Sequence, residues 1–285
     1  MPDDLFLRAL ADDGLYLPSI KVHSLEKIKR HNYFARVFSS GMKAKWPQRA
    51  YIGLYSGAGR AKIDPTGEII ETTAMSVLRL PDPFTHYIFV DSDPRCVDAL
   101  RTRSVSFSHG LSINVIQADV ANIAPAVRSA LPPFGRDRGL LSFCFVDPFA
   151  ADINFDTIRQ LSAYRMDFLV LLMLGWDARV NFQRYYNDRT STRLADMIDC
   201  PTWRAEWDAA NDRSVVRFLL RKFDEAMARL GYLTRRPDSA HRVTANGTGV
   251  MQYLLAFYSK SELGQKFWDE TLRRSEPQLA FDFPA

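Results

Sequence analysis

The sequence predicts an α/β fold built around a mostly parallel β-sheet. Three apolar segments are typical of buried strands, and each ends in a feature suited to a ligand site. Residues 50–56 run into a glycine turn, residues 86–91 end in an acid, and residues 140–146 run into Asp-Pro-Phe. Ligands of open α/β sheets bind outside the carboxyl ends of the strands. The three features are therefore expected in one crevice.

Hydrophobic periodicity and turn residues predict the other elements in chain order. Residues 1–23 are expected to form an irregular lead-in, and residues 24–46 an amphipathic helix. The turn sequence at residues 64–67 lies within an insertion of about a dozen residues after the glycines. Strands and helices then alternate: helix 72–78, strand 86–91, helix 94–103, strand 113–117, helix 122–131, strand 140–146, helix 155–164 and strand 167–174.

The pattern changes after Gly175. Residues 176–230 are expected to form a helical insertion, with a core-facing stripe of Phe218, Leu219, Phe223, Met227 and Leu230. Strands at 231–236 and 250–259 would form a terminal hairpin. Five parallel strands followed by a hairpin match a Rossmann-like, seven-stranded class I methyltransferase fold with helical additions. We expect one domain over residues 24–274 and a flexible tail over residues 275–285.

Composition indicates an ordinary soluble protein. The 285 residues are 47% hydrophobic and 25% charged, and no apolar run is long enough to cross a membrane. The first residues lack the basic start and apolar core of a signal peptide. Cys96, Cys144 and Cys200 are odd in number and widely spaced, which favours reduced thiols and a cytoplasmic location. The net charge of +4 neither requires nor opposes a nucleic-acid partner.

The glycine turn is the first candidate for cofactor binding. Tyr55, Ser56, Gly57 and Gly59 would let the backbone approach a ligand and present N–H groups to it. A purely structural turn is the alternative, because two spaced glycines are a weak signal.

Three acids follow strand ends in the same region. Asp91 is placed to accept hydrogen bonds from both hydroxyls of a ribose, whereas Asp93, before a proline, is expected to cap the next helix. Asp119, or a backbone amide beside it, is a candidate to bind the amino group of an adenine. A solvated loop acid is an equal alternative for Asp119.

Asp147, Pro148 and Phe149 are the candidate catalytic residues. They resemble the D-P-P-[FY] edge of amino-methyltransferases, in which a carboxylate and a nearby carbonyl hold a substrate NH2 and an aromatic ring stacks on the base. Ala150 follows where the pattern differs, so a simple turn into a helix is the alternative.

Basic residues suggest two nucleic-acid surfaces. One face of helix 24–46 carries Lys27, Lys29, Arg30, His31, Arg36, Lys43 and Lys45; we interpret it as a solvated face or, alternatively, as a phosphate-binding surface. A second set consists of Arg213, Arg217, Arg221, Lys222, Arg235, Arg236 and Arg242. The five histidines are scattered, so the sequence predicts no metal site.

In combination, several segments resemble the TcmP family, the three-Cys-motif partner proteins. They are the basic helix, residues 51–59, residues 66–71, residues 86–91, residues 145–149, and residues 253–260 followed by Phe267-Trp268. The chain differs from the family at Tyr55-Ser56, Thr73-Ala74 and Phe149-Ala150. The resemblance implies a methyltransferase-like fold, a bacterial source and a protein partner encoded nearby.

The tail contains a short motif. Gln278-Leu279-Ala280-Phe281-Asp282-Phe283 resembles peptides by which bacterial DNA-handling proteins bind the sliding clamp. A tail folded back onto its own domain is the alternative.

Three hypotheses follow from these features. The first is an S-adenosylmethionine-dependent methyltransferase that modifies a nitrogen of DNA or RNA. This is the leading hypothesis, and under it the protein is an enzyme. The second is a partner subunit that keeps the fold without turnover. The third is a metal-dependent nucleic-acid-processing enzyme, in which Asp64, Asp91, Asp119 and Asp147 would bind Mg²⁺.

Overall fold

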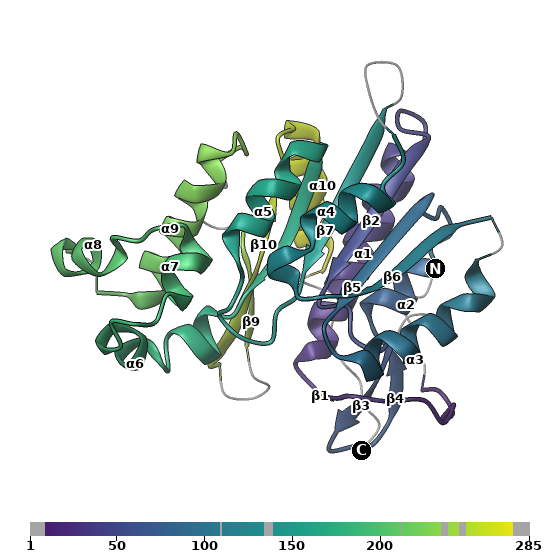
Figure 1. The fold of residues 1–285 in the computed structure, drawn as a ribbon, viewed down its shortest axis with the longest axis horizontal. Helices are drawn as coiled ribbons and strands as arrows, with labels where there is room; N and C mark the ends of the chain where they lie inside the picture. The colour runs from purple at the N-terminus through teal and green to yellow at the C-terminus, as the bar shows by residue number, and fades with distance from the viewer. Residues whose placement is uncertain are drawn as a thin grey trace.

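The structure is a computed structural model that describes residues 9–108, 110–133, 139–211, 213–234, 239–244 and 249–275 (Figure 1). A seven-stranded sheet forms its centre, in the order β6-β5-β2-β7-β8-β10-β9. These strands are β2 (Gln48–Leu54), β5 (His86–Asp91), β6 (Ser112–Gln117), β7 (Leu140–Val146), β8 (Met166–Leu172), β9 (His241–Thr244) and β10 (Met251–Tyr258). β10 is antiparallel to both neighbours, and the remaining pairs are parallel. This topology is the predicted Rossmann-like class I methyltransferase fold.

Helices cover both faces of the sheet. One face packs against α1 (Ser24–Met42), α2 (Thr73–Leu78), α3 (Pro94–Ser104) and α10 (Glu262–Ser275). The other packs against α4 (Ala124–Ala130), α5 (Phe155–Leu161) and α9 (Val215–Arg229). Side chains of a strand alternate between faces, so Phe143 and Phe145 of β7 join the first core, and Cys144 and Val146 join the second. Both faces are apolar, as expected for a covered parallel sheet.

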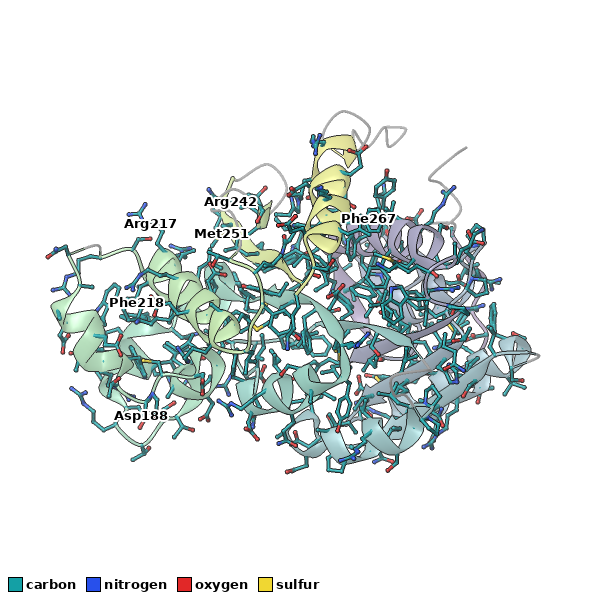
Figure 2. The ribbon with its side chains drawn as sticks, turned by 90° about the horizontal axis from the view of Figure 1, so that it is seen from above. Asp188, Arg217, Phe218, Arg242, Met251 and Phe267 are labelled. Atoms are coloured by element: carbon teal, nitrogen blue, oxygen red, sulfur yellow. The ribbon has the colours of Figure 1, made fainter. Side chains whose placement is uncertain are left out.

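Helices α1 and α10 pack closely although they lie at opposite ends of the chain. A Cβ atom at Gly41 would lie 2.8 Å from Cζ of Phe267, so a side chain there would force the ring to shift. Figure 2 shows Phe267 on α10. Phe34 and Trp268 meet edge to face nearby, with ring centroids 5.3 Å apart. α1 ends at Met42, so the expectation of a helix to residue 46 is wrong by one turn.

The lead-in and the insertion after the glycines form a second, small sheet. It consists of β1 (Ser19–Lys21), β3 (Arg60–Asp64) and β4 (Ile69–Glu71), in the order β1-β3-β4. One expectation is therefore corrected, because residues 19–21 form a strand and are not irregular. The predicted insertion is present as a β-hairpin, and the turn sequence at residues 64–67 joins its strands. Arg103, buried on α3, donates to both carboxylate oxygens of Asp13 at 2.7 and 2.8 Å, which ties the lead-in to the main domain.

The helical insertion after β8 is observed. It begins with η5 (Leu174–Ala178), continues through α6 (Phe182–Asn187), α7 (Arg193–Ile198) and α8 (Trp203–Ala209), and leads into α9. These helices gather at one end of the molecule, beside the β9 and β10 side of the sheet (Figure 1). Short 3-10 turns occur at η2 (Val105–Phe107), η3 (Val120–Asn122) and η4 (Ser162–Tyr164).

The terminal hairpin differs from the prediction in its first strand. Residues 231–234 form no strand, and residues 235–236 lie outside the described residues; β9 instead spans His241–Thr244. The tail motif at residues 278–283 also lies outside the described residues. Within the described ranges, no helix has both the length and the apolar character needed to cross a membrane.

Candidate active site

The structure brings the three predicted strand ends together. β5, β2 and β7 are neighbours in the sheet, and their carboxyl ends meet at one edge. The N–H of Ser56 donates to the carbonyl of Val90 at 2.9 Å, and the N–H of Asp147 donates to that of Leu54 at 3.3 Å. The glycine turn, Asp91 and Asp147 therefore belong to one site.

Asp91 fixes the glycine turn. Its Oδ2 accepts the N–H of Gly57 at 2.8 Å, and its Oδ1 accepts the N–H of Asp93 at 3.0 Å. A carboxylate has about four lone-pair positions, so each oxygen keeps one for a ligand, although the residue is only 9% exposed. The Ser56 hydroxyl is internal, because it donates to the Gly53 carbonyl at 2.8 Å. Asp93 caps α3 by accepting the N–H of Arg95 at 2.9 Å.

Gly57 and Gly59 have different surroundings. Both have positive φ, +64° at Gly57 and +82° at Gly59. A Cβ at Gly57 would meet no atom within 4 Å, whereas one at Gly59 would lie 2.7 Å from Met75 Cγ and 2.9 Å from Leu100 Cδ1. Gly57 thus leaves open space for a ligand, and Gly59 lets the turn pack against α2 and α3.

This difference predicts unequal costs of adding a methyl group. Gly57→Ala introduces backbone strain alone and should lower the free energy of unfolding by about 1 kcal/mol. Gly59→Ala adds a steric clash to the strain and should cost about 2–4 kcal/mol. Urea denaturation of both variants measures the difference. Equal costs would contradict the packing role of Gly59.

A cavity of about 520 Å³ opens at Asp147; we call it the inner cavity. Its walls include Lys27, Tyr55, Gly57, Thr72, Asp147 and Phe149. The Lys27 ammonium lies 2.8 Å from Oδ1 and 2.7 Å from Oδ2 of Asp147, with both side chains largely buried. Lys27 therefore belongs to the site, and the expectation of a solvated basic face is wrong for this part of the helix, whereas Lys43 and Lys45 just past its end are exposed as expected. Arg30 and His31 on the same face are buried too.

The Thr72 hydroxyl lies on the same wall. Its Oγ1 is buried and, within the described part of the chain, has no hydrogen-bond partner. Buried polar atoms are rarely left unsatisfied, so this atom suits a polar group of a ligand. No sequence motif indicates it.

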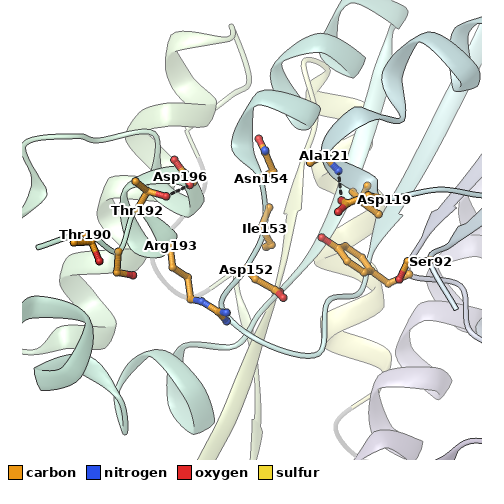
Figure 3. A pocket seen from close by; sticks show the side chains of 13 residues that line it. Ser92, Asp119, Ala121, Asp152, Ile153, Asn154, Thr190, Thr192, Arg193 and Asp196 are labelled. Carbon is orange, nitrogen blue, oxygen red and sulfur yellow. Dashed lines mark hydrogen bonds between the residues drawn. The ribbon is translucent and has the colours of Figure 1, made fainter. Parts of the chain in front are cut away.

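A second cavity, of about 630 Å³, lies beyond Tyr55; we call it the acidic cavity (Figure 3). Asp119 and Ser92 line one side, Asp152 and Asn154 the middle, and Arg193 with Asp196 of α7 the far side. Asp119 caps η3 by accepting the N–H of Ala121 at 2.8 Å. The carboxylates favour hydroxyl and amino groups and disfavour phosphate.

Tyr55 lines both cavities. Its φ of +62° is unusual for a residue with a side chain, and the turn holds it in this conformation. Burial, followed by the charges of Asp152 and Asp119, raises the pKa of Tyr55. Its hydroxyl therefore remains protonated at neutral pH and is available as a donor between the two cavities.

A buried polar network lies behind the inner cavity. The His31 ring nitrogens lie 2.8 Å from the Tyr51 hydroxyl and 2.9 Å from Asn32 Oδ1. Burial, opposed by the Asn32 hydrogen bond, lowers the pKa of His31 to about 4. This histidine is therefore neutral at pH 7 and positions α1 against the sheet. Within the described ranges, no group of three His, Cys, Asp or Glu side chains is arranged to hold a metal ion.

Comparison with known proteins gives structural likeness without close sequence similarity. No family model and no curated protein sequence matches the chain. A Legionella pneumophila protein of the DUF519 family superposes with a TM-score of 0.49 at 10% identity, over 86% of this chain and 90% of that one. A Streptomyces avermitilis protein of the DUF574 family gives 0.44 at 14% identity, over 84% and 86%. A Bacillus cereus O-methyltransferase, solved in complex with SAH, gives 0.42 at 12% identity, over 84% and 87%.

Proposed function

We propose that this protein is an S-adenosylmethionine-dependent methyltransferase whose acceptor is an amino nitrogen of a nucleobase in nucleic acid. The observation that carries the proposal is the single inner cavity shared by Gly57 of the glycine turn and Asp147 of the Asp-Pro-Phe edge. An amino acceptor at Asp147 would lie beside a ligand on the turn.

The residues present fit the cofactor. Its adenosine end suits the acidic cavity, where Asp119 would accept the adenine amino group. The free lone pairs of Asp91 suit the ribose hydroxyls, and the open space at Gly57 suits close approach of the methionine end. The buried Thr72 hydroxyl on the inner wall, which has no partner among the described residues, would gain one from that polar end.

The proposed chemistry depends on alignment. When bound, S-adenosylmethionine supplies an electrophilic methyl group. Asp147 would accept an N–H of the substrate amine and so turn the nitrogen lone pair toward that methyl group, and Lys27 would hold the carboxylate in place. The carboxylate is also placed to receive the proton that the nitrogen loses. Alignment of this kind contributes much of the rate of a transfer reaction.

One observation favours a second candidate, a non-catalytic partner subunit of the TcmP type. Lys27 contacts both oxygens of Asp147, so part of the carboxylate is already occupied. The segments that resemble the TcmP family support the same candidate. Under this alternative the protein binds the cofactor, or its partner, without turnover.

Titration calorimetry with S-adenosylmethionine and S-adenosylhomocysteine tests the cofactor site. We expect binding of both ligands, and a loss of about 10- to 100-fold in affinity for Asp91→Asn, because the amide turns an N–H toward a donor. Asp98→Asn, on the exposed side of α3, is the matched control and should bind as the parent does. Absence of heat and of thermal stabilisation with either ligand would overturn the proposal.

A further inference from the structure

Two aromatic rings stand exposed beside Asp147. Phe149 is 79% exposed and Trp176, in η5, is 61% exposed. Both line the inner cavity, and both also line a neighbouring cavity of about 490 Å³, which we call the arginine cavity because Arg184 and Arg193 line it. Exposed apolar groups gathered at one place mark an interaction site.

The rings are carried by well-packed backbone. The buried carboxylate of Asp177, next to Trp176, accepts the N–H of Ala151 at 2.7 Å and the Tyr185 hydroxyl at 2.8 Å. This carboxylate joins the loop that carries Phe149 to the segment that carries Trp176. A Cβ at Gly175 would lie 2.1 Å from the Met251 carbonyl oxygen, so η5 packs directly on β10. The backbone that carries the two rings is therefore held in place by buried contacts.

Two arginines, Arg184 and Arg193, line the arginine cavity together with the rings. Arg184 is exposed, and within the described residues it forms no ion pair. Arg193 lines both the acidic cavity and the arginine cavity, and it lies 3.9 Å from Asp177. Asp188, at the end of α6, lines this cavity as well as Asp177, and its Oδ1 accepts the Thr190 hydroxyl at 2.7 Å (Figure 2). Lys21 and Lys27 line the inner cavity, where they pair with Asp64 and Asp147.

We infer that this surface binds single-stranded nucleic acid. One unpaired base stacks with Phe149 and Trp176, and a neighbouring phosphate lies against Arg184. Flat rings beside arginines are how proteins hold single strands, because every base has a face to stack and every nucleotide a charge. The inference rests on the proposed function, since it is the proposed acceptor site at Asp147 that gives the base its place.

A duplex fits this surface poorly. The Asp147 side chain, in the inner cavity that both rings line, is only 14% exposed. A base must leave its stack and its pair before its amino group reaches that depth. An unpaired base meets no such cost, which favours a single strand over a duplex.

Fluorescence anisotropy with labelled 12-nucleotide single-stranded RNA, the same sequence as single-stranded DNA, and the corresponding duplexes tests the inference without cofactor. We expect tighter binding of at least one single strand than of its duplex. Trp176→Ala should weaken that binding by about 10- to 100-fold, the usual effect of losing one stacked base. Arg184→Gln should lower the slope of log K against log salt by about 0.7, the value for one phosphate contact on a single strand.

Matched controls lie elsewhere on the surface. Val105→Ala removes a similarly exposed apolar group, and Arg128→Gln an exposed cation of α4, and neither residue lines a cavity described above. The inference is overturned if Trp176→Ala binds like Val105→Ala, if duplexes bind as tightly as single strands, or if no polynucleotide binds at low salt. The last result would indicate that the exposed rings bind a protein partner instead.

Calorimetry on Arg184→Gln separates this inference from the proposed function. Its affinity for S-adenosylmethionine should equal that of the parent, because Arg184 lines the arginine cavity and neither the inner nor the acidic cavity. If the protein binds oligonucleotides but not the cofactor, the nucleic-acid surface is supported and the methyltransferase proposal is contradicted. If it binds the cofactor but no oligonucleotide, the cofactor site is supported and the nucleic-acid surface is contradicted.

Discussion

Replacing Asp147 by asparagine is expected to lower the rate of methyl transfer by about 100- to 1,000-fold, the usual cost of losing one precisely placed group at a reacting centre. The affinity for S-adenosylmethionine should stay that of the parent. The expected loss of rate follows from the Lys27 ammonium, which lies within 2.8 Å of both carboxylate oxygens. In the variant the amide oxygen would face Lys27, so the amide NH2 would face the acceptor. A donor would then meet a donor, and the acceptor nitrogen would lose its alignment.

Single-turnover transfer of a labelled methyl group to single-stranded RNA or DNA measures this effect. Asp98→Asn, the same change on an exposed helix, controls for the substitution itself. Lys27→Gln serves as a companion variant: Asp147 keeps its charge but loses its anchor, so we expect a smaller loss, of about tenfold. A parent protein that binds cofactor but transfers no methyl group would favour the partner subunit. Equal activity of Asp147→Asn and the parent would show that Asp147 has no role in methyl transfer.

The sequence predicts the sheet well because its strands are covered on both faces. Continuous apolar runs bounded by turn residues gave β5 and β7 at their observed limits, and the acids that follow them fell at one edge because parallel strands end together. The prediction fails for short strands that form only by pairing with one another in the folded chain. β1 and β4 have three residues each, and their partner is β3, far from β1 in the chain. Local patterns carry little information about such pairs.

The site was predicted in outline but without its main electrostatic partner. Helical periodicity placed Lys27 on a basic face, yet the contact with Asp147 joins residues 120 positions apart. No local rule separates Lys27 from an exposed lysine such as Lys45. Ion pairs also occupy part of the second basic set: Arg221 and Lys222 pair with Glu225 on the same helix, and Lys222 also pairs with Glu206 of α8. Arg184 carries no motif, and it became a candidate only through its place in the arginine cavity.

A buried acid and a buried base should give this protein opposing pH dependences. Asp167, in β8, is 8% exposed, and burial, partly offset by a hydrogen bond from Ser259, raises its pKa to about 7. The unfolded state then loses this proton at lower pH than the folded state. The stabilisation that Asp167 gives is complete below pH ~4 and is lost as pH rises to about 7, a change of about 4 kcal/mol.

His31 acts in the other direction. It is fully buried with a pKa of about 4, below the ordinary value of 6.5. The unfolded state binds the proton first as pH falls, so His31 costs stability between pH ~6.5 and ~4, by about 3 kcal/mol. Over that window the two groups nearly cancel, and the parent should show a weaker pH dependence than either residue alone would cause.

Single variants should separate the contributions of Asp167 and His31 to the pH dependence of stability. Relative to the parent, Asp167→Asn should gain about 4 kcal/mol in the free energy of unfolding between pH 4 and pH 8, because its amide does not ionise. His31→Gln should lose about 3 kcal/mol relative to the parent between pH 4 and pH 6.5, because the parent alone recovers a neutral histidine. Urea denaturation across pH gives both differences, and groups common to the parent and the variants cancel. A flat difference for Asp167→Asn would mean that Asp167 ionises in the fold as it does in water, and that the space beneath α10 is wetter than its 8% exposure implies.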